Sequence, residues 1–133
     1  MAELLRVKDY KSIYIIDTAQ KELDKLYKKS HGDTIKYQKF LSDCLAKLDE
    51  TEHIDDLIEC MPRVVESLHR DKYGYTLYSI RNTKIAGNPR MLFTVEYDDE
   101  GMQTFLLLAF KEQNKSDYRL GIDNAFDRLR SVL

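Results

Sequence analysis

Near residue 73 the hydrophobic pattern of this chain changes from mainly helical spacing to alternation. The first regular segment, KSIYIID (residues 11–17), is rich in β-branched and aromatic side chains and predicts a strand. Thr18 can cap a helix that begins directly after this strand. The apolar face of the predicted helix consists of Ala19, Leu23, Leu26 and Tyr27.

A second helix is predicted after the residues HGD (31–33), which interrupt the first one. It starts at Asp33 or Thr34, because apolar residues recur at helical spacing from there on. Its apolar positions are Tyr37, Phe40, Leu41, Cys44, Leu45 and Leu48. Because the break is short, we expect the two helices to form an antiparallel hairpin.

The segment 49–72 is the least regular part of the sequence. Residues 49–59 are acidic, and Pro62 favours the start of a short helix in the residues that follow it. The pattern gives no firmer assignment for this segment.

From Tyr73 onward, apolar residues alternate with polar ones. Strands are predicted at residues 73–82, 90–98 and 102–110. The turn DDEG (98–101) makes the last two strands a hairpin, and the longer loop 82–89 joins the first two. A final helix from about Lys115 has the apolar stripe Tyr118, Ile122, Ala125, Phe126, Leu129 and Leu133.

These elements predict a single α+β domain over residues 1–133. Helices come early in the chain and strands come late, with one strand before the helices. We therefore expect the helices to pack on one face of a largely antiparallel, four-stranded sheet.

The composition adds limits on the class of protein. Charged residues make up 33% of the chain, yet the formal net charge is only −2, which argues against disorder and against a globally basic nucleic-acid binder. The longest apolar run, 105–110, is too short to span a bilayer, and the charged opening MAELLRVKDY lacks the pattern of a signal peptide. We expect a cytoplasmic protein without a membrane partner, in which Cys44 and Cys60 are reduced thiols.

The small net charge hides an asymmetry along the chain. Residues 43–59 contain seven acidic residues and one basic residue, whereas residues 69–95 contain five basic residues and one acidic residue. The five basic residues are Arg70, Lys72, Arg81, Lys84 and Arg90. Two solvated faces of a balanced protein would explain this pattern. If the strands are neighbours, five cations at strand ends and in the loop could instead form one patch for a polyanion such as an RNA backbone: Arg81, Lys84, Arg90, Lys111 and Lys115.

The C-terminal half resembles bacterial toxins of the RelE/HigB type. The resemblance lies in LYSIR (77–81), PRMLF (89–93) and AFK (109–111), in this order and spacing, and in the lysine-containing segment that opens the last helix. The earlier YIIDTAQKELDKL (14–26) is similar to the first strand and helix of that family.

This resemblance implies a microbial RNase-like fold, with a helical hairpin on a curved antiparallel sheet. It also implies an endoribonuclease that cleaves mRNA in the ribosomal A site and that a cognate antitoxin holds inactive. The chain departs from the family in two ways: it is slightly acidic, and the second lysine of the K-K-x-x-K segment is Glu112. Relatives that poison DNA gyrase share the fold and lack the nuclease residues, so the fold alone does not give the activity.

RNA cleavage of this kind needs a base for the 2′-hydroxyl, cations for the developing phosphate charge and an acid for the leaving oxygen. It needs no metal, and the sequence has no HxxxH, HExxH or CxxC motif, no P-loop and no GxGxxG. We therefore expect neither a metal nor a small-molecule cofactor.

Four residues are candidates for a catalytic role: Arg81, Arg90, Lys111 and Tyr118. The arginines suit bidentate contact with phosphate, and the resemblance places a cation at Lys111 and a catalytic tyrosine at Tyr118. Each has a structural alternative: surface residues at strand ends for the three cations, and core packing for the tyrosine.

Further candidates surround these four. Residues expected to bind RNA are Lys84, Lys115, Arg70 and Lys72. Glu112 is a candidate general base, or else a surface carboxylate paired with Lys115 three positions later. His69 titrates near neutrality, but a lone histidine is more often structural.

The sequence thus predicts an mRNA-cleaving toxin whose partners are an antitoxin, mRNA and the ribosome. Two alternatives stay open: a non-enzymatic inhibitor that binds a protein such as gyrase, and a catalytically silent protein of a phage or mobile element.

Overall fold

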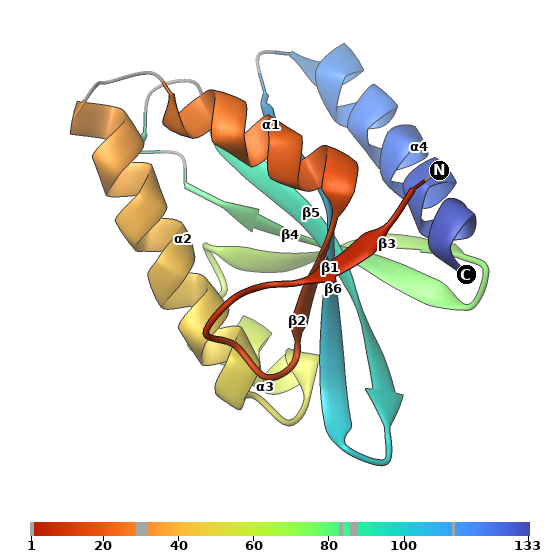
Figure 1. The fold of residues 1–133 in the computed structure, drawn as a ribbon. Coiled ribbons are helices and arrows are strands. Elements are labelled where there is room, and N and C mark those ends of the chain that lie inside the picture. Colours follow the sequence, from red (N-terminus) through yellow and green to blue (C-terminus); the bar gives the residue numbers. More distant parts are fainter. Residues whose placement is uncertain (1, 29–31, 83, 86–87, 113) are drawn as a thin grey trace.

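The computed structural model describes residues 2–28, 32–82, 84–85, 88–112 and 114–133, which form four helices and one six-stranded sheet (Figure 1). The strands are β1 Leu4–Arg6, β2 Ile13–Ile16, β3 Val65–Lys72, β4 Tyr75–Arg81, β5 Pro89–Asp98 and β6 Gly101–Lys111. The helices are α1 Asp17–Tyr27, α2 Gly32–Glu50, α3 Ile54–Cys60 and α4 Lys115–Val132. The α+β class is confirmed.

The sheet has the strand order β1-β2-β6-β5-β4-β3. Every neighbouring pair is antiparallel except β2 and β6, which are parallel. The largely antiparallel sheet is therefore confirmed, but it has six strands instead of the predicted four. The two additional strands, β1 and β3, form its edges.

Strand β3 lies where a short helix was predicted from Pro62. Its first half pairs with β4 in the register Val65↔Ile80, and the β-branched Val64 and Val65 suit this pairing. The register shifts between Ser67 and Asp71, where His69 has a φ of 52°. A helix does exist in the segment, but it is α3, which begins earlier and is capped by His53, whose side chain accepts a hydrogen bond from the amide of Asp55.

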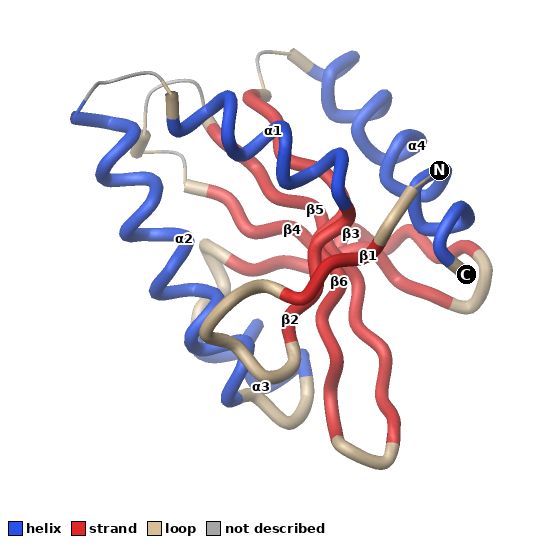
Figure 2. The backbone as a smooth tube through the Cα atoms, viewed as in Figure 1, coloured by secondary structure: helices blue, strands red, loops and turns tan. Residues whose placement is uncertain are grey.

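The helices cover both faces of the sheet, not one as predicted. Along β5, Met91 and Phe93 belong to a core formed with α1, α2 and α3, whereas Leu92 between them belongs to a second core formed with α4. Because successive strand residues point to opposite faces, α4 packs on the face opposite to the helical hairpin. Figure 2 shows the strands lying between α2 and α4.

The hairpin of α1 and α2 is confirmed. The Tyr27 and Tyr37 rings lie 6.3 Å apart, and the Thr34 hydroxyl donates to the carbonyl of Leu26 across the junction. The predicted apolar positions of α2 are buried, with Phe40 half-buried, but His31 of the predicted break lies outside the described residues. Thr18 does not cap α1: the helix begins at Asp17, whose carboxylate accepts from the Thr18 amide at 3.0 Å.

An ion pair attaches α1 and α4 to β6. Strand β2 pairs with β6 only as far as Leu106, so none of the described strands lies beside the outer edge of β6 beyond that point. Glu22 of α1 accepts from the Ala109 amide at 3.1 Å, and Arg128 of α4 donates to the Leu107 carbonyl at 2.9 Å. Glu22 and Arg128 also bind each other, at 2.6 and 2.9 Å, and so replace the missing strand.

Helix α4 starts at Lys115 as predicted, with the Asn114 side chain accepting from the Asp117 amide. It approaches β6 closely at Gly121, where a Cβ atom would lie 3.1 Å from the Phe110 ring. Its predicted stripe is buried from Ile122 to Leu129, but Leu133 is 61% exposed.

The two cysteines are free, Cys44 buried and Cys60 exposed. None of the helices in the described part of the chain is both long enough and apolar enough to cross a membrane.

Candidate functional site

Polar and charged side chains gather where β3, β4, β5 and β6 meet the first turn of α4. The registers Glu66↔Ser79 and Arg81↔Arg90 place these four residues on the same face, since residues paired across antiparallel strands point to the same side. This is the face that α4 covers. With Glu112 and Tyr118, they form what we call the arginine–carboxylate cluster.

Arg90 lies at the centre of the cluster and is only 5% exposed. Its guanidinium donates to Glu66 at 3.1 Å, to the Ser79 hydroxyl at 3.3 Å, and through Nε to Glu112. The Tyr118 ring covers it at 4.8 Å. A buried charge of this kind persists because two carboxylates compensate it.

These contacts define what Arg90 can do. Carboxylates already occupy Nε and Nη1 of its guanidinium, so in this arrangement Arg90 holds Glu66, Glu112 and Tyr118 in place. Its direct contact with phosphate stays a prediction.

Arg81 is more accessible than Arg90. Its side chain is 33% exposed, and its Nε lies 3.7 Å from the same Glu66 oxygen that Arg90 binds, a distance longer than a hydrogen bond. The Arg81 backbone is fixed, because its amide donates to the Val64 carbonyl. Of the two arginines, Arg81 is the better placed for a ligand.

The partners of Glu112 precede it in the chain, whereas the sequence left open a partner that follows it. Its carboxylate accepts from Arg90 and from the Asn88 side chain, and its amide donates to the Asn88 carbonyl. The ion pair with Lys115 that the sequence left open is not among the ion pairs of the described residues. At the position where the resemblance expects a lysine, the chain therefore has an internal partner for Arg90.

Tyr118 is half-buried between α4 and the cluster. Burial raises the pKa of its hydroxyl above the ordinary value of 10, and Glu66 and Glu112 raise it further, against the opposing effect of Arg90 and Arg70. The hydroxyl therefore stays protonated at neutral pH and can donate a proton but cannot accept one.

Lys111 and Lys72, two further predicted site residues, lie outside the arginine–carboxylate cluster. Lys111 pairs with Pro89 and, by alternation with Phe110 and Glu112, points to the face of the helical hairpin, away from the cluster. Lys72 lies over the Tyr73 and Phe126 rings, at 5.4 and 6.0 Å.

Two more candidates lie on the surface. Lys84 is exposed in the β4–β5 loop, where its amide donates to the Asn82 side chain. His69 is exposed at the irregularity of β3.

Arg70 and Lys115 do come together. They line a groove of about 600 Å³ between β3 and α4, beside the cluster, with Tyr118, Arg119, Ile122 and Asp123. Three of these six residues are cationic and one is anionic. Of the four residues expected to bind RNA, this groove therefore brings together Arg70 and Lys115.

Sequence reasoning missed Glu66 and Ser79. Ser79 could have been found from the sequence, because it lies on the same face of a predicted strand as Leu77 and Arg81, which are two positions away on either side. Glu66 could not, since it fell in the segment taken for a helix.

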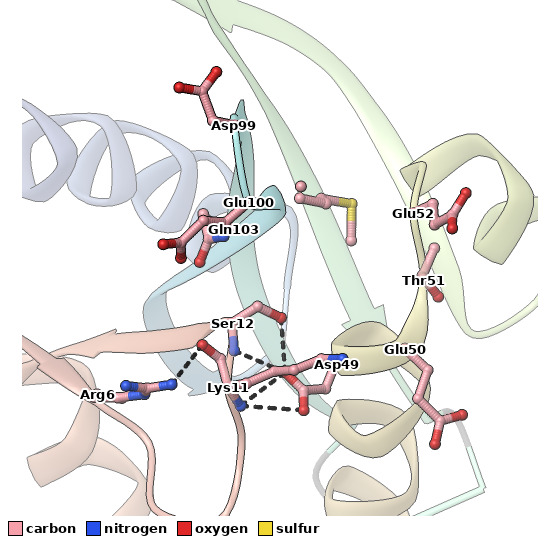
Figure 3. Close-up of a pocket in the computed structure, with 12 residues that line it drawn as sticks. Arg6, Lys11, Ser12, Asp49, Glu50, Thr51, Glu52, Asp99, Glu100 and Gln103 are labelled. Carbon is pink, nitrogen blue, oxygen red and sulfur yellow. Dashed lines mark hydrogen bonds between the residues drawn. The ribbon is translucent and has the colours of Figure 1, made fainter.

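A second hollow, of about 620 Å³, lies near the C-terminal end of α2 and the β5–β6 turn (Figure 3). Asp49 lines this hollow, and its carboxylate accepts hydrogen bonds from the Lys11 and Ser12 amides and from the Ser12 hydroxyl. Burial acts to raise the pKa of this carboxyl, but the hydrogen bonds together outweigh it and lower the pKa.

No group of three or more histidine, cysteine, aspartate or glutamate side chains within the described ranges has a geometry that could hold a metal ion.

Comparisons of this chain with models of protein families, with curated proteins and with solved structures find no match.

Proposed function

We propose that this protein is a toxin of the RelE/HigB type that cleaves mRNA without a metal ion, with the arginine–carboxylate cluster as its active site. One observation carries the proposal: carboxylates, arginines and a protonated tyrosine from β3, β4, β5, α4 and the end of β6 converge beside a cationic groove. These are the three kinds of group that the reaction requires.

Each group has a role in the proposed reaction. Glu66, whose side chain is 31% exposed, takes the proton of the 2′-hydroxyl as that oxygen attacks the phosphorus atom. Arg81 compensates the charge that develops on the phosphate oxygens. Tyr118 gives its proton to the 5′-oxygen as the P–O5′ bond breaks, which leaves a 2′,3′-cyclic phosphate and a free 5′-hydroxyl. Arg90 and Glu112 are positioning residues.

The resemblance also supplies the wider expectations. The helical hairpin on a mainly antiparallel sheet supports a microbial RNase-like fold, and the ribosomal A site, a cognate antitoxin and a cytoplasmic location belong to the same proposal. Strands β1 and β3 and the placement of Lys111 are the features that the resemblance does not anticipate.

One observation favours a second candidate, a non-enzymatic inhibitor that binds a protein such as gyrase. Both carboxylates of the cluster are engaged by arginines, so the cluster could serve only to fix α4 on the sheet. Under this function the helical hairpin would be the binding surface.

The test is cleavage of a short RNA by the purified protein, with and without ribosomes and in the presence of EDTA. We expect cuts that survive EDTA and that disappear when the scissile nucleotide is 2′-deoxy. Glu66→Gln and Arg81→Ala should each reduce the rate by about 100-fold or more. Matched controls are Glu59→Gln and Arg130→Ala, which change the same charges at exposed positions outside the cluster.

Induced expression in bacteria, with mapping of new mRNA 5′ ends, tests the toxin itself. Growth arrest with cuts, lost in Glu66→Gln and Arg81→Ala, is the expected outcome. Arrest without cuts would favour the protein-binding inhibitor, and growth without arrest from folded protein would contradict the toxin.

A further inference from the structure

The charge of the site is divided unevenly between the cluster and the groove. In the cluster, two arginines face two carboxylates, so the net charge is near zero. In the groove, Arg70, Lys115 and Arg119 outnumber Asp123. The attraction for a polyanion therefore comes from the groove.

The cations of the groove are available to a ligand. Arg70, Lys115 and Arg119 are all exposed, and none of them forms an ion pair with another described residue. Arg90 and Arg128, by contrast, are occupied by carboxylates at hydrogen-bond distance. Guanidinium groups without an internal partner are the strongest phosphate ligands that this surface offers.

The backbone of β3 and α4 positions these cations on the two sides of the groove. The register of β3 shifts between Ser67 and Asp71, and such an irregularity turns the side chains of an edge strand; Arg70 lies within it. Arg119 lies on α4 next to Tyr118, and Gly121 lets this helix lie close against β6. Arg70 is near enough to Tyr118 to influence its hydroxyl.

From these observations we infer that the groove between β3 and α4 is a phosphate subsite for single-stranded RNA. Arg70 and Arg119 bind the phosphate next to the one cleaved, and Lys115 contributes long-range attraction. The inference rests on the proposed function for the identity of the ligand. It assigns RNA binding to the groove and RNA cleavage to the arginine–carboxylate cluster.

The shape of the groove favours a single strand. Tyr118 and Ile122 provide an apolar surface beside the cations, and a charged groove with an aromatic side chain suits an unpaired strand, whose sugar and base can enter it. A duplex keeps its bases stacked inside, so no base can enter the groove and lie against Tyr118.

The experiment uses a fluorescein-labelled 2′-O-methyl RNA hexamer, which lacks the 2′-hydroxyl and so cannot be cleaved by this route. Anisotropy gives its Kd at several salt concentrations. Arg70→Ala combined with Arg119→Ala should weaken binding about tenfold at low salt and reduce the slope of log K against log salt by about 0.7, the value for one phosphate on a single strand. The control, Lys36→Ala with Arg130→Ala, removes two exposed charges elsewhere and should leave the slope near the wild-type value.

Binding and cleavage fail separately in this design. Unchanged affinity and slope in the Arg70/Arg119 variant would overturn the subsite even if the protein cleaves RNA. A lost slope in a protein that cleaves nothing would support the subsite and contradict the nuclease. Equal binding of the hexamer and its duplex, or of a glutamate-rich peptide of the same charge, would overturn the assignment to single-stranded RNA.

Discussion

Arg90 and Arg128 both lie against the sheet and are bound by carboxylates, but their surroundings differ. Arg128 binds one carboxylate at two points and a backbone carbonyl, and its partner Glu22 binds a backbone amide. Arg90 binds two carboxylates and a hydroxyl and lies under a tyrosine ring.

This difference separates a structural ion pair from a candidate reactive one. The Arg128 pair binds backbone groups at the outer edge of β6, beside which no described strand lies, and these contacts explain its structural role. Among the described residues, no side chain of the arginine–carboxylate cluster forms a hydrogen bond with a backbone group. Its charged side chains mainly compensate one another, with Asn88 as a further partner of Glu112, which makes the cluster the candidate reactive site.

The largest effect is expected from removing Arg90. Arg90→Ala leaves Glu66 and Glu112 close together without their cation, and should lower the free energy of unfolding by about 3–5 kcal/mol. Urea denaturation at pH 7 measures this loss. The triple variant Glu66→Gln, Arg90→Met, Glu112→Gln replaces the whole cluster by neutral groups and should regain most of the stability without regaining RNA cleavage. A triple variant that cleaves RNA would contradict the proposed active site.

Removing Arg128 should cost nearly as much stability but leave the chemistry intact. Arg128→Ala exposes the Leu107 carbonyl and leaves Glu22 without its cation, so we expect a loss of about 3 kcal/mol in urea denaturation. RNA cleavage per folded molecule should stay close to wild type. Arg130→Ala, two positions later and exposed, is the matched control and should change stability by less than about 0.5 kcal/mol.

Tyr118→Phe tests the proposed acid alone. The ring that covers Arg90 is retained, so stability should stay within about 0.5 kcal/mol, while RNA cleavage should fall about 100-fold. Because the folded protein raises the pKa of Tyr118 above 10, the wild-type rate should persist through neutral pH and fall on the alkaline side as that hydroxyl ionises. A Tyr118→Phe rate equal to wild type would remove the tyrosine from the mechanism. Tyr73→Phe, at a 41% exposed position, is the control.

Asp49 is a structural carboxylate like Glu22, since it too accepts hydrogen bonds from backbone amides. Asp49→Asn should reduce stability by about 1 kcal/mol at pH 7. A depressed folded-state pKa contributes stability above the unfolded value, about 3.9, and loses it as the pH falls through the folded-state value. The difference between wild type and Asp49→Asn should therefore shrink below about pH 4. A difference that does not depend on pH would mean that the hydrogen-bond geometry, and not the charge, matters.

The sequence predicted the elements whose patterns are local. The stripe of α2, the alternation in β4, β5 and β6, and the start of α4 at Lys115 are all found. The candidate site was predicted in part: Arg81, Arg90 and Tyr118 converge, whereas Lys111 points to the opposite face. Alternation shows which residues of one strand point to the same side, but it does not relate the sides of two strands. Whether Lys111 and Arg90 point to the same face could therefore be decided only from the pairing of β5 with β6.

The sequence by itself determined the class of fold and the residue types at the strand ends, because side-chain periodicity follows from helix and strand geometry. Tertiary structure alone decided that 65–72 is a strand, since pairing with β4 outweighs local helical preference. It also decided that Glu66 and Glu112 compensate Arg90, because a contact between side chains 22 and 24 positions apart depends on register, which no local pattern encodes.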